Sequence, residues 1–176
     1  MDRYLFTFTM RADGSSKFAK GNQWGYFPSG AFAWRVYDDS FMQGTHDWLS
    51  NLKLRLSLGT SGNNRIPSGA MYTTYSLGGT SSSNIYFNEQ ASIILQPGDA
   101  LSNPNLKWET TISRNLGLDF GFLNNRLSGS LDFYWNTTKD LLMKTTIPAG
   151  SGYSYQYKNF GQTSNKGVEL QLDATL

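Results

Sequence analysis

The chain has 176 residues, a formal net charge of +2 and no cysteine, while 15% of its residues are aromatic and 18 are glycine. Its Lys and Arg residues are dispersed, which argues against a nucleic-acid-binding surface, and the lack of cysteine excludes disulfides and thiolate metal sites within the chain. No stretch reaches the roughly 18 to 20 apolar residues of a membrane-spanning helix, and the first residues do not resemble a signal peptide.

Six segments alternate between apolar and polar residues with a period of two, which is typical of β-strands with two different faces. The clearest is the third, in which every second residue from Leu52 to Leu58 is leucine, with Lys53 and Arg55 among the residues between them. Arg114 interrupts the apolar row of the fourth segment and weakens that assignment. In chain order, the predicted strands are residues 4–11, 31–36, 52–59, 108–122, 127–136 and 168–175.

The connections between these strands differ greatly in length. Residues 123–126 form a short hairpin turn in which an Asn pair readily supplies positive φ, and residues 13–23 form a turn of moderate length. Residues 60–106 and 139–158 are long connections without a recognisable regular structure. Such long loops are rare in compact soluble domains, whereas transmembrane β-barrels carry them on their outer side.

Residues 38–51 form a connection of intermediate length that we expect to contain a short helical turn capped by Asp38 and Asp39. His46, the only histidine, lies in this connection and is expected in a solvated turn. One histidine cannot by itself build a metal cluster or a catalytic triad, and the sequence shows no paired catalytic carboxylates. We therefore expect no catalytic residues, no metal site, no cofactor and no enzymatic activity.

These patterns predict an all-β fold, specifically an antiparallel transmembrane β-barrel segment with long extracellular loops. Hydrocarbon offers the backbone no hydrogen-bond partner, so strands cross a bilayer only in a closed ladder, with apolar faces toward lipid and polar faces toward the lumen. Aromatic residues near the predicted strand ends would form interfacial girdles: Tyr4, Trp24, Tyr26, Trp34, Trp108, Phe122 and Trp135. The residues predicted to face the lumen are Lys53, Arg55, Asn115, Asp119, Asp132, Glu169, Gln171 and Asp173.

Tyrosines in the two long connections are candidates for substrate binding, because aromatic faces suit the C–H faces of sugars. An alternative interpretation is a soluble β-sandwich that binds carbohydrate through the same tyrosines, since sandwich strands also alternate. The candidate tyrosines are Tyr72, Tyr75, Tyr86, Tyr153, Tyr155 and Tyr157.

Six sequence blocks in one order carry a family resemblance: RADGSSKF, WGYFPSGAFAWRV, LKLRLSLGTSGN, NPNLKWETT, NLGLDFGFLNNRLSGSLDFYWNTTKDLL and NKGVELQLDATL. Together they resemble the barrel region of TonB-dependent outer-membrane transporters of the SusC/RagA type. The resemblance implies import of glycans, oligosaccharides or peptides across the outer membrane of a Gram-negative, Bacteroidetes-like cell. It also implies two partners, a SusD-like surface lipoprotein and the TonB complex, and a wall in contact with outer-membrane lipid.

The resemblance covers nearly the whole chain but only part of a transporter. About six strands cannot close a barrel of 22 strands, so residues 1–176 are expected to be a partial barrel domain. The plug domain, the TonB box and the signal peptide of the family are expected to lie outside this chain. In the family's topology, the turn at residues 123–126 would be periplasmic and the two long connections extracellular.

Overall fold

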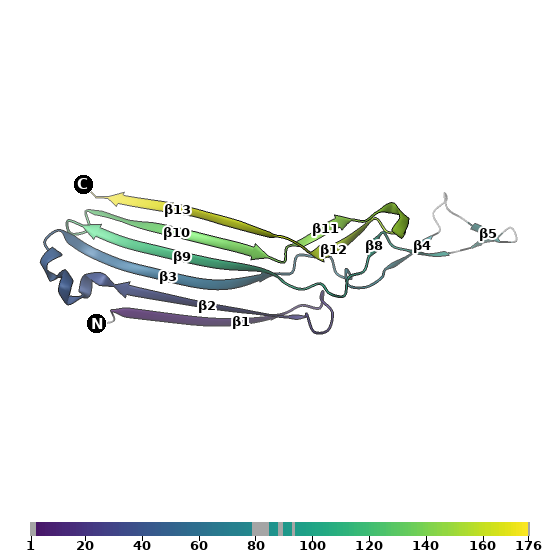
Figure 1. Ribbon diagram of the computed structural model, residues 1–176, viewed down its shortest axis with the longest axis horizontal. Helices are drawn as coiled ribbons and strands as arrows, with labels where there is room; N and C mark the ends of the chain where they lie inside the picture. Colours follow the sequence, from purple (N-terminus) through teal and green to yellow (C-terminus); the bar gives the residue numbers. More distant parts are fainter. Residues whose placement is uncertain (1–2, 79–84, 88–89, 93, 176) are drawn as a thin grey trace.

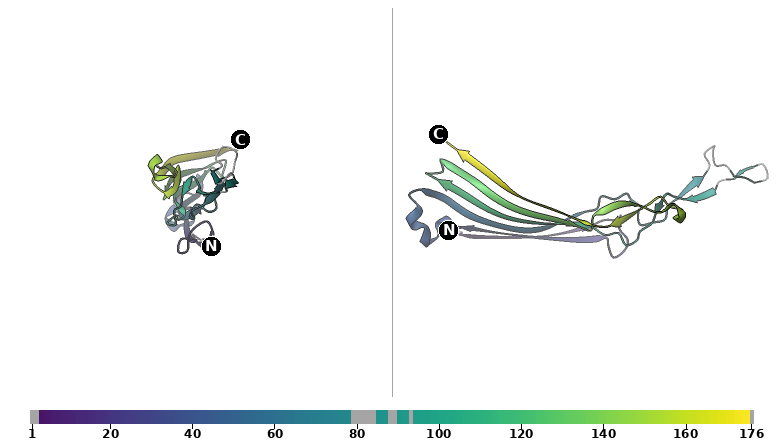
Figure 2. Two further views of the ribbon diagram at one scale, coloured as in Figure 1. Left: turned by 90° about the vertical axis from the view of Figure 1, so that its right-hand side faces the viewer. Right: turned by 45° about the horizontal axis from the view of Figure 1, so that its top comes forward.

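A computed structural model describes residues 3–78, 85–87, 90–92 and 94–175. Six long strands form one antiparallel sheet in the order β1-β2-β3-β9-β10-β13 (Figure 1). The sheet is curved and open, with β1 and β13 as its outer strands, and the two ends of the chain lie at the same end of it (Figure 2). The six strands are β1 (Tyr4–Gly14), β2 (Trp24–Arg35), β3 (Leu49–Asn63), β9 (Glu109–Phe122), β10 (Leu127–Lys139) and β13 (Gln162–Ala174).

The register of the six strands places most apolar side chains on one face of the sheet and most polar side chains on the other. Directly opposed residues of antiparallel strands point to the same face, so the pairing defines rows across the sheet. One such row crosses all six strands and contains only apolar side chains. It runs Phe6, Phe32, Leu56, Leu116, Phe133 and Val168.

The apolar face is open rather than packed against another layer. Phe6 is 78% exposed and Leu56 is 43% exposed. Many other large apolar side chains of this face are exposed as well. All six long strands belong to this single sheet, so no second sheet of a sandwich covers it within the described part of the chain. The alternative of a soluble β-sandwich does not describe this fold, because a sandwich buries its apolar faces between two sheets.

All six predicted strands are confirmed, with differences at their ends. β2 begins at Trp24, well before the predicted start, because it pairs along the whole length of β1. Val36, expected at the end of that strand, instead begins the 3₁₀ helix η1 (Val36–Asp38). Arg114 does not disturb β9, since it keeps its place in the ladders with β3 and β10.

The short turn and the helical connection lie at one end of the sheet, which we call the turn end. Leu123, Asn124 and Asn125 have φ of 53°, 58° and 60°, confirming the positive φ expected of the Asn pair and adding a leucine. The predicted helical turn is also present, as η1 and as η2 (Ser40–Thr45).

The prediction that Asp38 and Asp39 cap this helical turn is wrong, because neither helix has a side-chain cap hydrogen bond. Both carboxylates are engaged elsewhere. Asp39 accepts hydrogen bonds from Arg3 Nη1 (3.1 Å) and Trp34 Nε1 (2.7 Å), and Asp38 pairs with Arg35 at 3.1 Å. Through these contacts, the two aspartates tie the helical connection to Arg3 and to the end of β2.

Contrary to expectation, the long connections contain regular secondary structure. They form short strands beyond the opposite end of the sheet, which we call the loop end (Figure 1). β8, from the first connection, pairs in parallel with β12, from the second. The elements are β4 (Tyr75–Gly78), β5 (Ile85–Phe87), β6 (Gln90–Ser92), β7 (Ile94–Pro97), β8 (Ala100–Leu101), β11 (Leu142–Thr146), η3 (Ala149–Ser151) and β12 (Tyr155–Asn159).

A small core lies under these connections at the loop end. Phe18, Ile66 and Leu106 are buried together, and Trp108 packs against them with its ring centroid 5.4 Å from that of Phe18. Trp108 also donates a hydrogen bond from Nε1 to the carbonyl of Gln23 (3.1 Å). We call the folded connections at the loop end the loop assembly. Trp108 is a core residue of this assembly and not part of an interfacial girdle, because the turn of residues 13–23 folds back over it.

The long strands are long enough to cross a bilayer. A 14-residue strand such as β9 measures about 46 Å, or about 33 Å along the membrane normal at a tilt of about 45°, more than the apolar band of about 25 Å. Among the described residues, no helix has the length and apolar character needed to cross a membrane.

A pair of substitutions on β3 tests which face meets lipid. In the complete protein embedded in lipid vesicles, Leu56→Arg should lower the free energy of unfolding by about 2–4 kcal/mol, because it places a charge in hydrocarbon. Ser57→Arg, one residue further and on the opposite face, should change it by less than about 1 kcal/mol. Urea titration followed by tryptophan fluorescence measures both, and equal effects of the two variants would contradict the assignment of faces.

Candidate functional site

The polar face of the sheet carries all eight residues predicted to face a lumen. Lys53 lies opposite Asp119, and the next row joins Arg55, Gly117, Asp132 and Glu169 across four strands. The register therefore brings together charges that are far apart in the sequence. That this face lines an enclosed lumen stays a prediction.

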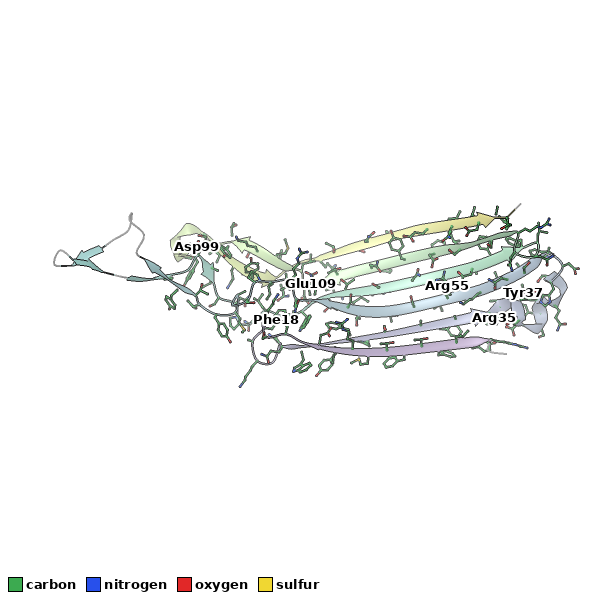
Figure 3. All side chains as sticks on the ribbon, turned by 180° about the vertical axis from the view of Figure 1, so that it is seen from behind. Phe18, Arg35, Tyr37, Arg55, Asp99 and Glu109 are labelled. Carbon is green, nitrogen blue, oxygen red and sulfur yellow. The ribbon has the colours of Figure 1, made fainter. Side chains whose placement is uncertain are left out.

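Arg55 is the centre of the polar face and lies near the middle of β3 (Figure 3). Its Nε donates to both carboxylate oxygens of Asp119 on β9 at 3.0 Å, and its Nη2 lies 2.8 Å from Asp119 Oδ1. The same Nη2 donates to Asp132 on β10 at 3.0 and 3.1 Å. Asn115 completes the network by donating from Nδ2 to Asp132 Oδ1 (2.9 Å). One guanidinium thus ties three neighbouring strands together through charge-assisted hydrogen bonds.

Gly117 makes this bridge possible. It lies between Arg55 and Asp132 in the register, so the Arg55 side chain passes directly over it. A Cβ at this position would lie 2.6 Å from Asp132 Oδ1 and 2.7 Å from Arg55 Cζ, closer than side-chain atoms allow. The sequence contained a signal for this role, a glycine within a polar row, but its meaning depends on the register with two other strands.

The other predicted polar residues lie on the outer strand β13. Glu169 opposes Asp132, and Gln171 donates from Nε2 to Asp173 Oδ2 at 3.2 Å. Glu169 also lines a polar hollow of about 540 Å³. Carboxylate and amide oxygens dominate this part of the face, so it suits ligands that donate hydrogen bonds.

The candidate tyrosines occupy different environments at the loop end. Tyr72 and Tyr75 are 64% and 62% exposed, and are free to stack on a ligand. Tyr153 is half-buried near η3. The backbone of Tyr86 lies in β5, while its side chain falls outside the described part of the structure.

Tyr155 and Tyr157 are committed to contacts within the loop assembly. Their rings meet edge to face with centroids 5.9 Å apart, and Lys144 Nζ lies 3.7 Å from the centroid of Tyr155. Tyr157 also packs against the buried cluster around Phe18. The sequence did not indicate the contact with Lys144, because it requires the pairing of β11 with β12.

Amide side chains join the loop assembly to the sheet, a role that the sequence analysis missed. Asn159 accepts a hydrogen bond from the Lys107 amide (2.9 Å) and donates to the carbonyls of Lys107 (2.8 Å) and Asp140 (2.9 Å). Glu109, labelled in Figure 3 at the junction, accepts from Asn63 Nδ2 (3.0 Å) and from the Leu142 amide (2.9 Å). Both long connections are therefore fixed to the strands from which they emerge.

No group of three or more His, Asp or Glu residues able to hold a metal ion occurs among the described residues. His46 stacks on Tyr37 with ring centroids 4.3 Å apart, and its Nε2 lies 3.1 Å from the Tyr37 carbonyl oxygen. The described polar face presents hydrogen-bonding groups, and the loop end presents exposed aromatic faces.

Replacing Gly117 by alanine should break the bridge centred on Arg55. We expect Gly117→Ala to lower the free energy of unfolding by about 1–3 kcal/mol, the value of charged hydrogen bonds lost at a partly exposed site. Gly30→Ala is the matched control, because a Cβ there meets nothing closer than 3.8 Å. Urea unfolding of both variants in vesicles measures the difference, and an equal stability would show that the bridge is not needed.

Removing the side-chain amide of Asn159 should loosen the loop assembly without affecting the sheet. Hydrogen–deuterium exchange of the β11 and β12 amides should become about tenfold faster in Asn159→Ala, because three hydrogen bonds are lost. Asn105→Ala removes an exposed amide in the same region as a control. Unchanged exchange in Asn159→Ala would mean that other contacts hold the loops.

Comparison with known proteins gives a consistent result over the whole chain. Residues 1–176 match the family model described as TonB dependent receptor-like, beta-barrel. The chain is 41% identical to the TonB-dependent receptor SusC of Bacteroides thetaiotaomicron over 175 residues, which is 99% of this chain and 17% of SusC. It is 37% identical to the TonB-dependent receptor P3 of Formosa agariphila over 172 residues, which is 98% of this chain and 16% of that receptor.

Solved structures agree with the sequence relatives. The structure of the RagAB peptide importer in its closed-closed state superposes with a TM-score of 0.82 at 32% identity, covering 99% of this chain and 18% of that one. The chain thus spans less than a fifth of the length of the relatives it matches. These relatives are receptors and transporters rather than enzymes. The chain belongs to the TonB-dependent receptor family and forms a segment of a β-barrel of the SusC/RagA type.

Proposed function

We propose that this chain supplies wall and outer loops to a TonB-dependent importer in the outer membrane of a Gram-negative, Bacteroidetes-like bacterium. One observation carries the proposal: a single sheet that is mainly apolar on one face and mainly polar on the other, with a folded loop assembly at one end only. A barrel wall between lipid and a wet lumen requires these two faces. The complete protein imports oligosaccharides or peptides.

The loop end lies outside the cell and the turn end in the periplasm. Barrels of this kind have short periplasmic turns and long extracellular loops, and the four-residue turn at 123–126 contrasts with the folded connections at the opposite end. Family membership supports a plug domain within the barrel and energy supplied through TonB. Both involve parts of the receptor other than the wall described here.

The outer loops contact substrate and a SusD-like surface lipoprotein that covers the barrel. Tyr72 and Tyr75 are the best placed candidates, because they combine high exposure with a setting of uncharged polar residues. Aromatic rings stack on sugar C–H faces and also bind apolar side chains of peptides. The similarity to the RagAB importer supports a two-component assembly.

Deletion of the complete gene tests the importer directly. The deletion strain should lose growth on one class of oligosaccharide or peptide that the parent uses, and the tagged receptor should retain a surface lipoprotein during purification. Growth of the deletion strain equal to the parent on every oligosaccharide and peptide pool supplied, with no lipoprotein retained, would overturn the proposal.

Substitution of the exposed tyrosines tests their part in uptake. Tyr72→Ala combined with Tyr75→Ala should reduce uptake of the identified substrate about tenfold, because stacking on two aromatic rings is lost. Phe41→Ala is the matched control, since it removes an aromatic side chain that is 65% exposed at the turn end. Labelled-substrate uptake at equal receptor abundance measures the effect, and parent-like uptake would assign the tyrosines to loop packing.

A further inference from the structure

The apolar face of the sheet carries one arginine, Arg114, to which the proposed function assigns no role. Arg114 lies on β9 opposite Leu58 of β3 and Trp135 of β10, so it shares the face of the leucine row. Its guanidinium lies 5.1 Å from the centroid of the Trp135 ring. Its Nη1 is buried and has no hydrogen-bond partner in the described part of the chain. A cation on a face that meets lipid is costly unless it reaches an anionic partner.

A second cation belongs to the same row. Lys166 on β13 lies opposite Trp135 and is exposed. The indole Nε1 of Trp135 donates to Ser164 Oγ on β13 at 3.0 Å, which orients the ring beneath the Arg114 guanidinium. Neither cation forms an ion pair with a described residue. The pairing places every Asp and Glu of the six strands on the opposite face.

An apolar groove leads to Arg114, the first of these two cations. It is a shallow hollow of about 870 Å³ that extends from Phe6 and Phe8 on β1, across Gly30 on β2, to Arg114 and Trp135. The missing side chain at Gly30 opens the groove, because Gly30 lies between Phe8 and Leu58 in the register. Its lining is mainly apolar along its length and cationic at one end, which matches an amphiphile with an acyl chain and a negative headgroup.

The depth of Arg114 in the membrane supports the same ligand. Arg114 lies eight residues before Phe122, which corresponds to about 26 Å along the strand and about 19 Å along the membrane normal. If the apolar band of about 25 Å begins at Phe122, its other boundary lies only about 6 Å beyond Arg114. The Arg114 side chain is long enough to place its guanidinium at that boundary. The headgroups that it can reach belong to the leaflet at the loop end.

We propose that Arg114, Trp135 and Lys166 form a binding site for an anionic lipid of the outer leaflet. The phosphate of the lipid is bound by the two cations, and one acyl chain lies in the groove over Gly30. This inference depends on the apolar face meeting lipid and not on import, so a failed lipid test leaves the proposed importer intact. Bound in this way, the lipid neutralises the two cations, Arg114 and Lys166, on the apolar face.

The test uses the complete receptor purified in neutral detergent and titrated with defined lipids. Native mass spectrometry should show a preference of about thirtyfold for phosphatidylglycerol over phosphatidylcholine of the same acyl chains, since each cation near a headgroup contributes about 1 kcal/mol. Arg114→Gln combined with Lys166→Gln should abolish this preference. Lys20→Gln combined with Lys158→Gln removes the same charge from exposed positions outside the face and should preserve it.

A second variant tests the acyl chain independently of charge. A Cβ at Gly30 has no neighbour closer than 3.8 Å, so Gly30→Leu fits the backbone and fills the groove. It should weaken binding of both lipids about tenfold, while inorganic phosphate at millimolar concentration should not displace bound lipid. Equal binding of the two lipids by the parent, or an unchanged preference in the double charge variant, would overturn the proposal. Displacement by inorganic phosphate, or unchanged binding in Gly30→Leu, would overturn the placement of the acyl chain.

Discussion

The structure depends on one constraint, that every backbone amide and carbonyl within hydrocarbon needs a partner from the chain itself. Within the described part of the chain, the four inner strands meet this constraint through antiparallel ladders on both sides, while β1 and β13 are paired on one side only. A ladder also fixes the register, and a slip of one residue would move every side chain to the opposite face. The row from Phe6 to Val168 and the polar row beside it are therefore consequences of the same hydrogen bonds.

The two faces are stabilised in different ways. The apolar face contains exposed aromatic and aliphatic side chains that gain their stabilisation from lipid, which explains why the buried core of the described residues is so small. The polar face depends on specific contacts. Arg55 forms ion pairs with Asp119 and Asp132 and so links three strands. Gly117 leaves space for the Arg55 side chain to cross the middle strand. These charges are therefore paired within the sheet itself.

The loop assembly continues beyond the end of the sheet, but its short strands do not alternate regularly between apolar and polar residues. Its strands are short, its core is limited to residues such as Phe18 and Leu106, and side-chain amides such as that of Asn159 join it to the sheet. Exposed tyrosines are carried on this anchored base. A base anchored in this way holds exposed side chains in place while the sequence between the anchors can vary.

The sequence by itself determined the all-β class, the presence of the six long strands and the face of the side chains within the alternating segments, because a period of two is visible within each segment alone. It also determined the positive-φ turn at Asn124 and Asn125, since turn chemistry is local as well. Only the tertiary structure decided which strands are neighbours, and with that the bridge from Arg55 over Gly117, the burial of Trp108 and the contact of Arg114 with Trp135. It also decided that Asp39 accepts hydrogen bonds from Arg3 and Trp34 instead of capping a helix. Each of these depends on pairing between residues distant in sequence, which no local pattern encodes.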